Sequence, residues 1–230
     1  MRIAVVLPIL NEAATLPGML RSLQEQTRRP DRITVVDGGS IDSSTAIVRS
    51  TTVEPIVVSG VGRGGQIAAG VRQCPEDLIV VAHADMRFPP TAFETLQQFL
   101  LRHPDCPGGC FGHRFDNGRP IYRAIEWWDR LRAKRGYSFG DQAQFFRLEM
   151  LGRVGGFPPL PLMEDVELAR RLRLVGRPAY LDSPVTISAR RYESHGWPPV
   201  AWMNWRLRQT YRREGEAACW RLFRQYYGKT

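Results

Sequence analysis

Four short runs of Val, Ile and Leu mark the first half of the chain, and longer amphipathic segments separate them. The runs cover residues 3–7, 33–36, 56–58 and 78–82. Continuous apolar runs of this length are typical of strands that are buried on both faces. The segments between them predict helices over residues 12–26, 42–50 and 66–73. Strands that alternate with helices predict an α/β fold with a mainly parallel central sheet flanked by helices.

The regular alternation ends in the second half of the chain. The pattern there predicts a helix over residues 91–102, a strand over 109–115 and a helix over 164–175. Tyr122, Ile125, Trp128 and Leu131 recur at helical spacing and predict the apolar face of another amphipathic helix. The Gly- and Pro-rich residues 152–161 predict a loop. Since no internal repeat or linker interrupts the pattern, we expect a single domain over residues 1–230.

Polar segments follow three of the predicted strands, at residues 8–11, 37–40 and 83–85. Ligands of parallel sheets bind beyond the carboxyl ends of the strands, so these segments are expected to border a binding crevice. Asp37 could serve there as a ligand-binding carboxylate, or it could simply cap a turn with the glycines that follow it. Asp85 has the same two interpretations, and its hard oxygen ligands would suit Mg²⁺ or Mn²⁺ shared with a diphosphate.

A further acidic pair, Glu164 and Asp165, opens the predicted helix over residues 164–175. The helix dipole alone favours acidic residues at this position. One of the pair could instead be a general base, which the preceding Gly- and Pro-rich loop would bring to a substrate hydroxyl.

Composition and charge narrow the class of partner. The 230 residues are 43% hydrophobic and 24% charged, which excludes a mainly disordered or fibrous chain. A net charge of +9 favours anionic partners such as nucleotides, nucleic acid, phosphorylated substrates or an acidic lipid surface.

The few, irregularly spaced cysteines predict that the protein works in a reducing cytoplasm. No apolar segment approaches the roughly 18 residues of a spanning helix, so the chain is not expected to cross a membrane by itself.

Taken together, the motifs resemble those of the inverting family 2 glycosyltransferases, which have the GT-A nucleotide-sugar-binding fold. They are Pro-Ile-Leu-Asn-Glu at residues 8–12, Val-Val-Asp-Gly-Gly-Ser-Ile-Asp at 35–42, His-Ala-Asp at 83–85 and Met-Glu-Asp at 163–165. The resemblance covers about residues 2–192. His83 stands where the family's Asp-x-Asp has its first Asp, which is similar to a small, soluble bacterial branch of these enzymes. The resemblance implies a nucleotide-sugar-binding half (1–115), an acceptor and catalytic half (116–199) and a basic, aromatic helical tail (200–230).

The resemblance also implies roles for individual residues. A nucleoside diphosphate sugar, most commonly a UDP-sugar, would be bound by Pro8, Asn11, Glu12, Asp37, Arg63, Gly64, Ala84, Asp85 and Arg191. Asp85 would coordinate a divalent cation, Mn²⁺ or Mg²⁺; His83 could add a neutral imidazole, which suits Mn²⁺ better, or could only form a hydrogen bond. Asp165, with Glu164 beside it, matches the general base that deprotonates a hydroxyl acceptor, so that the sugar is transferred with inversion. Asp141 and Gln142 would line the acceptor side, and the resemblance to a late metal ligand at His195 is weaker.

Two other motifs compete with this interpretation. Residues 60–65 satisfy G-x-G-x-x-G, the pattern of an NAD(P)-dependent oxidoreductase, but they follow the third predicted strand rather than the first. A zinc site is suggested by the spacing of His103, Cys106, Cys110 and His113. If residues 109–115 form a strand, however, Cys110 and His113 point to opposite faces and do not converge on one ion.

The tail interleaves aromatic and basic residues, including Trp202, Trp205, Arg206, Arg208 and Trp220. Three interpretations remain open for it. The tail could pack on the domain through Trp202/Trp205 and Trp220/Phe223/Tyr227, or lie peripherally on the anionic inner face of a membrane and serve a lipid-linked acceptor. It could also make the chain a non-enzymatic basic module for lipid or nucleic acid, although no nucleic-acid motif accompanies the charge and no such partner is expected.

Overall fold

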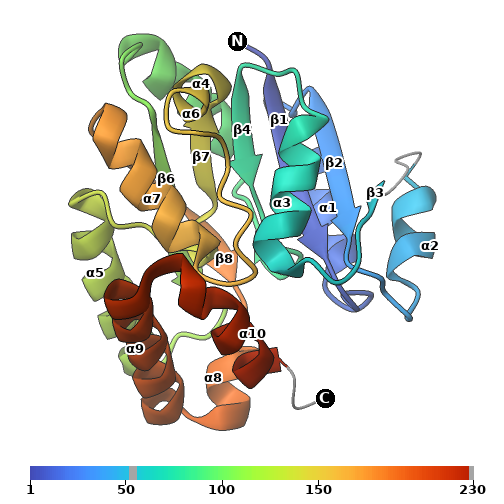
Figure 1. Cartoon of the computed structure of the whole chain (residues 1–230). Helices are drawn as coiled ribbons and strands as arrows, with labels where there is room; N and C mark the ends of the chain where they lie inside the picture. The colour runs from blue at the N-terminus through green and yellow to red at the C-terminus, as the bar shows by residue number, and fades with distance from the viewer. Residues whose placement is uncertain (52–55, 228–230) are drawn as a thin grey trace.

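One curved sheet of eight strands organises the computed structural model, which describes residues 1–51 and 56–227 (Figure 1). The strand order is β3-β2-β1-β4-β7-β6-β8-β5. The strands are β1 (Ile3–Ile9), β2 (Arg32–Asp37), β3 (Ile56–Val57), β4 (Leu78–Val81), β5 (Met86–Arg87), β6 (Gly108–Phe115), β7 (Gln144–Arg147) and β8 (Ala179–Ile187). Neighbours from β3 to β4 pair in parallel, as do β6 and β8, whereas β7 and β5 pair antiparallel to their neighbours. The predicted mainly parallel sheet is confirmed.

Helices cover both faces because successive residues of the central strands point in opposite directions. Ile3, Val5 and Leu7 of β1 share one core with residues 16–23 and 92–100, whereas Ala4 and Val6 share another with residues 67–71 and 168–172. The helices of the first half are α1 (Leu16–Gln24), α2 (Ser44–Arg49), α3 (Gly62–Arg72) and α4 (Ala92–Arg102). Those of the second half are α5 (Pro120–Lys134), η1 (Gly140–Gln142), α6 (Leu148–Gly152), α7 (Glu164–Val175), α8 (Arg190–His195), α9 (Trp197–Glu214), η2 (Gly215–Ala218) and α10 (Cys219–Tyr227).

Several element boundaries differ from the predicted ones. Helix α3 begins at Gly62 rather than at Gln66, so the glycine motif forms the first turn of a helix instead of a loop. Strands β5, β7 and β8 are not predicted from the apolar runs. Strand β8 alternates buried and partly exposed residues, and β5 and β7 are short, so none of them contains a continuous run of Val and Ile. On α5, Tyr122 is buried as predicted, but Trp128 is 65% exposed, so the predicted apolar stripe is only partly covered.

The tail packs on the domain, but through other residues than the predicted tryptophans. Leu207, Tyr211, Cys219 and Leu222 form a small core with the residues that precede α7, namely Leu160, Leu162 and Met163. Trp202, Trp205 and Trp220 lie on the outer surface, 47–59% exposed. The side chain of Tyr227 and residues 228–230 lie outside the described part of the chain. In the described residues, no helix is both long enough and apolar enough to span a bilayer.

Candidate functional site

The polar segments that follow β1, β2 and β4 meet at one edge of the sheet, because these strands are parallel neighbours. The loop after β1 is tied to the loop after β2. The backbone N–H of Asn11 donates to Ser40 Oγ at 2.9 Å, and the N–H of Ile41 donates to Asn11 Oδ1 at 2.9 Å. Asn11 has φ 56°, a left-handed conformation that asparagine tolerates better than most residues. These hydrogen bonds hold the two loops together at the edge of the sheet where the sequence predicts a crevice.

Asp37 holds the turn that follows β2. Its carboxylate accepts hydrogen bonds from the N–H groups of Gly39, at 3.2 Å, and Ser40, at 3.0 and 3.1 Å, and the side chain is buried. The turn-capping role is thus present in the structure, and contact with a nucleoside remains a prediction. Gln66, which sequence reasoning missed, supports the same edge: its Nε2 donates to the carbonyls of Ile9 and Val36 at 3.0 and 2.9 Å. Its position on the buried face of a helix gave no signal of this role.

The pKa values of two side chains that follow β4, Asp85 and His83, are shifted by their surroundings. Burial, together with the neighbouring carboxylate of Glu12, raises the pKa of Asp85. Burial and the positive charge of Arg63 lower the pKa of His83 to about 3, so its imidazole is neutral. The Nε2 atom of His83 is buried without a hydrogen-bond partner among the described residues. A buried carboxylate and a neutral imidazole are groups that fit a divalent cation. Two other residues predicted on the donor side are buried: Pro8 near the end of β1, and Ala84 in the turn between β4 and β5.

Asp165 lies in the first turn of α7, where two backbone groups orient its carboxylate. The N–H of Gly140 donates to Oδ2 at 2.7 Å, and the N–H of Val166 donates to Oδ1 at 2.8 Å. The side-chain amide of Gln144 donates to the Asp165 carbonyl at 2.9 Å. Met163, the residue before α7, has φ 68°, which is a strained conformation for a non-glycine residue and is typical of functional sites.

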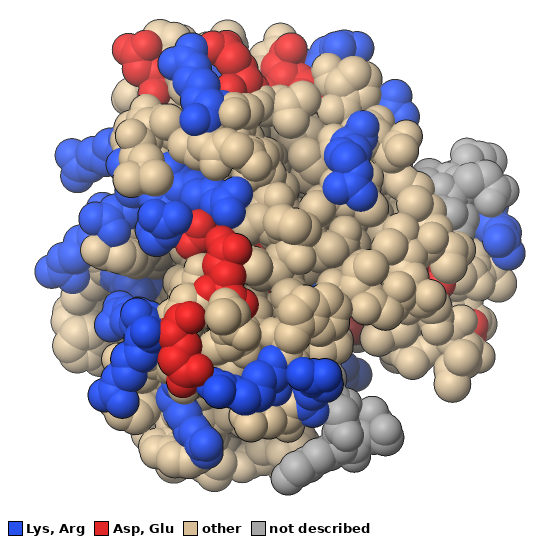
Figure 2. Space-filling model, in the orientation of Figure 1, with Lys and Arg blue, Asp and Glu red and all other residues tan. Residues whose placement is uncertain are grey.

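A pocket of about 150 Å³ opens beside Asp165. Three residues predicted from the sequence line it as well: Arg63, Asp141 and Arg191. Its far wall belongs to α9, which contributes residues that sequence reasoning did not place in a site: Asn204, Leu207 and Arg208. Figure 2 shows that basic side chains gather over the half of this face that contains α5, α7 and α9. The pocket therefore combines carboxylates with guanidinium groups that suit a phosphorylated or otherwise anionic ligand.

Arg63 and Glu164 form an ion pair between α3 and α7. Glu164 is 1% exposed, and burial raises its pKa despite the adjacent guanidinium. Its Oε2 atom has no hydrogen-bond partner in the described part of the chain. Of the two predicted catalytic carboxylates, only Asp165 lines the pocket, and Glu164 contacts Arg63 behind it.

The glycines of α3 allow close packing between helices. A Cβ at Gly64 would lie 2.1 Å from the Leu160 carbonyl oxygen, and a Cβ at Gly62 would lie 2.6 Å from Pro161 Cα. The backbone that precedes α7 thus covers the face where a dinucleotide would have to approach. This contact disfavours the oxidoreductase interpretation of residues 60–65.

The other predicted ligand sets do not form in the structure. Within residues 1–51 and 56–227, the one group of three or more ligand atoms within 4.8 Å consists of His113, Asp129 and Asp141, so the quartet that begins at His103 does not converge. His195 ends α8, where its ring contacts Ser194 Oγ at 2.8 Å. Gln142 is buried, and its Oε1 accepts hydrogen bonds from Arg132 and from the N–H of Phe139, both at 3.2 Å.

Comparison with known proteins shows which family the chain belongs to. Residues 4–151 match the sequence profile described as Glycosyl transferase family 2. The chain belongs to glycosyl transferase family 2. It is 30% identical over 130 residues to an undecaprenyl-phosphate 4-deoxy-4-formamido-L-arabinose transferase of Pseudomonas fluorescens (strain Pf0-1), covering 52% of this chain and 38% of the relative. The enzyme of that name from Pseudomonas syringae pv. syringae (strain B728a) is 30% identical over 125 residues, covering 50% of this chain and 37% of the relative. The chain thus spans well under half the length of both relatives.

Solved structures show the same fold at low identity. S. aureus TarS 1-349 in complex with UDP-GlcNAc superposes with a TM-score of 0.67 and 18% identity, over 82% of this chain and 58% of that one. The mannosyltransferase PcManGT from Pyrobaculum calidifontis, in complex with GDP-Man and Mn²⁺, superposes with a TM-score of 0.63 and 21% identity, over 94% of this family 2 chain and 63% of that one. The family 2 chain therefore has the GT-A fold that its motifs imply.

Proposed function

We propose that this family 2 member transfers a sugar from a nucleoside diphosphate sugar, with a UDP-sugar as the first donor to test, to a hydroxyl acceptor with inversion. The observation that carries the proposal is the position of Asp165. Its carboxylate lines the pocket, and two backbone N–H groups fix its orientation. A general base held in this way can accept the proton of an acceptor hydroxyl as that oxygen attacks the anomeric carbon. Attack from the face opposite the nucleotide inverts the configuration.

The donor side of the proposal rests on the groups at the ends of β1, β2 and β4. Asn11, Asp37 and Asp85 would contact the nucleoside diphosphate, with the pocket residue Arg191 close to phosphate. Asp85, and His83 as a neutral imidazole, would hold Mn²⁺ or Mg²⁺, whose charge stabilises the departing diphosphate. Glu164 is assigned a positioning role, because it holds the Arg63 guanidinium at the edge of the pocket.

A lipid-linked acceptor at the inner face of a membrane is favoured by the outer surface of α9. Trp202 and Trp205 are 59% and 53% exposed, and the Arg206 guanidinium lies 5.5 Å from the Trp202 ring. Exposed indole rings beside arginines are typical of surfaces that enter the headgroup layer of anionic bilayers. Two relatives are named for an undecaprenyl-phosphate acceptor, which agrees in class with this assignment.

Calorimetric titration tests the donor assignment without knowledge of the acceptor. The panel contains UDP, GDP, their common sugar conjugates and NAD(P), each with and without Mn²⁺. We expect micromolar binding of one sugar nucleotide that Mn²⁺ strengthens, and loss of the Mn²⁺-dependent gain in Asp85→Ala. Asp182→Ala, which changes a carboxylate that is 64% exposed on β8, serves as the matched control. Binding of NAD(P) alone, or no binding across the panel, would overturn the proposal.

A further inference from the structure

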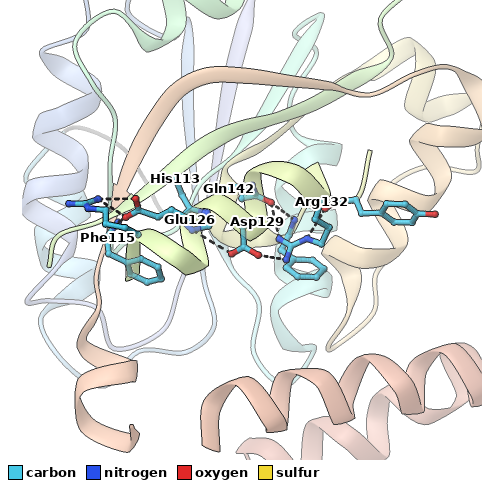
Figure 3. Close-up of polar contacts among 9 residues, drawn as sticks. His113, Phe115, Glu126, Asp129, Arg132 and Gln142 are labelled. Carbon is cyan, nitrogen blue, oxygen red and sulfur yellow. Dashed lines mark hydrogen bonds and ion pairs between the residues drawn. The ribbon is translucent and has the colours of Figure 1, made fainter. Parts of the chain in front are cut away.

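Three ligand-type side chains converge on one point from separate elements: His113 from β6, Asp129 from α5 and Asp141 from η1. One ligand atom from each lies within 4.8 Å of the others. Figure 3 shows the His113 ring and the Asp129 carboxylate directed toward one another between β6 and α5. His113 Nε2 lies 3.5 Å from Asp129 Oδ2, a distance beyond an ordinary hydrogen bond.

The histidine is buried without a polar partner. Its side chain is 1% exposed, and neither ring nitrogen forms a hydrogen bond within the described part of the chain. One Asp141 oxygen, Oδ1, is likewise buried and unpartnered there. Burying such atoms without a hydrogen-bond partner is unfavourable, so a buried histidine normally has a partner. The arrangement thus presents unused donor atoms from two elements to a common point.

The charges around this point suit a cation. Arg132 contacts Asp129 Oδ1, which leaves Oδ2 directed at the imidazole. Two carboxyl groups, those of Asp129 and Asp141, share this cluster with the guanidinium of Arg132.

An ion could reach this cluster from two sides. His113 lines a pocket of about 210 Å³ between α5 and β8, and Asp141 lines the pocket beside Asp165. A metal site needs such an entry path in addition to its ligands.

We propose that His113, Asp129 and Asp141 form a second metal site, which binds a divalent transition-metal ion independently of the nucleotide. One imidazole and two carboxylates are a ligand set for Zn²⁺ or Mn²⁺, and three protein ligands leave a coordination position for water. Ligands of such ions lie about 3 Å from one another, so a modest contraction of the present cluster completes the site. Zn²⁺ binds more tightly than Mn²⁺, and Mg²⁺ binds least because imidazole is a poor ligand for it.

A metal ion at this site would stabilise η1, the short helix next to the proposed base Asp165. Asp141 follows Gly140, whose N–H donates to Asp165 Oδ2 at 2.7 Å. An ion bound to Asp141, His113 and Asp129 would link η1 to β6 and α5. It would thereby fix the position of the Gly140 N–H that donates to Asp165. Its role is therefore a positioning one, and metal binding itself does not depend on whether the chain transfers a sugar.

Metal titration of the chelator-stripped protein without nucleotide tests the proposal. We expect one Zn²⁺ per chain and a rise in melting temperature on binding. His113→Gln should weaken this binding by more than the roughly 10–100-fold loss that follows change of an outer-shell residue. His103→Gln, at an exposed histidine stacked on Phe99 at 4.2 Å, should bind Zn²⁺ as the unaltered chain does, and so should Asp85→Ala.

A crystal of the unaltered chain grown with Zn²⁺ keeps the proposal testable if His113→Gln fails to fold. We expect an anomalous scattering peak between His113, Asp129 and Asp141. Equal loss of binding in His113→Gln and His103→Gln, a stoichiometry of zero, or a peak at another position would overturn the proposal. Loss of sugar-nucleotide binding without loss of Zn²⁺ binding would contradict only the proposed function.

Discussion

His83 Nε2 and Asp165 Oδ2 face the same side of Gly140. A Cβ added to this glycine would lie 3.0 Å from the histidine nitrogen and 3.4 Å from the carboxylate oxygen. The imidazole is neutral, because burial and the charge of Arg63 lower its pKa to about 3. The His-Ala-Asp segment thus brings its histidine beside the proposed base, while Asp85 lies near the carboxylate of Glu12. Gly140 is the point at which the proposed donor and acceptor sides meet.

Gly140→Ala is therefore expected to impair catalysis. The added methyl group must displace His83, Asp165 or the turn that contains Gly140, and a displacement of about 1 Å near reacting groups can cost about 100-fold in rate. We expect kcat to fall by about 10-fold or more while the donor still binds. Steady-state kinetics with the identified sugar donor measure this effect. Gly152→Ala is the matched control, because a Cβ there has no neighbour within 4 Å. An unchanged kcat in Gly140→Ala would show that this contact does not matter for the reaction.

Asp165→Asn tests the proposed base directly. An asparagine side-chain oxygen can still accept the hydrogen bond from the Gly140 N–H, so the fold is expected to persist. It cannot accept the acceptor proton, and loss of a general base costs about 100- to 10,000-fold in rate. We expect donor affinity to change little while transfer falls by this factor. Asp182→Asn is the surface control. Full transfer activity in Asp165→Asn would place the base elsewhere.

The fold and the meeting of the polar segments at one edge of the sheet were predictable because they depend on local pattern. Runs of Val and Ile gave β1, β2 and β4, and a parallel sheet brings the residues that follow them, such as Asn11 and Asp85, to one edge. Glu164 and Asp165 were predicted at a helix start for the same reason. The local sequence does not determine which of the two lines the pocket, because that depends on the distant partner Arg63, on α3.

The rest of the pocket depends on tertiary contacts that leave no local signal. Arg208 belongs to a basic segment that also suits a solvated surface, and it becomes a pocket wall only because Leu207 and Tyr211 pack on the backbone before α7. The interpretation that Trp202 and Trp205 pack the tail on the domain is wrong, because helical spacing identifies a face but not the partner that covers it. The Cβ position of Gly64 is filled by the Leu160 carbonyl, whereas its contact with a nucleotide stays a prediction.

Gly64→Ala distinguishes packing from ligand binding at the glycine motif. The new Cβ would lie 2.1 Å from a backbone oxygen, so α3 and the segment before α7 must separate. Overpacking of this kind costs about 1–3 kcal/mol of the free energy of unfolding. Urea denaturation compared with Gly152→Ala measures the loss. Undiminished stability together with lost nucleotide binding would mean that the glycine faces a ligand instead.

Tyr211→Phe tests how α9 is held against α7. Tyr211 OH donates to Glu167 Oε2 at 2.8 Å, and Arg170 and Arg171 also donate to this carboxylate. Burial opposes ionisation of Glu167, but these three hydrogen-bond donors outweigh it and lower its pKa from 4.5 to about 2. A hydrogen bond to a charged group contributes about 1.5–3 kcal/mol, so the variant should lose roughly this much at pH 7. Tyr137→Phe, at a ring that is 43% exposed and lies under Arg173, is the matched control.

The pH dependence of the same variant follows from the lowered pKa of Glu167. A carboxyl whose folded pKa lies below its unfolded value stabilises the fold fully above about pH 4.5, and the stabilisation is lost as the pH falls toward 2. The full contribution is about 3 kcal/mol, since each unit of pKa corresponds to about 1.4 kcal/mol. Because Tyr211→Phe removes one cause of the shift, the difference in unfolding free energy between the two proteins should shrink from pH 7 to pH 3. Urea denaturation at pH 7, 5 and 3 measures it, and a difference that stays constant over this range would mean that Tyr211 stabilises α9 by packing alone.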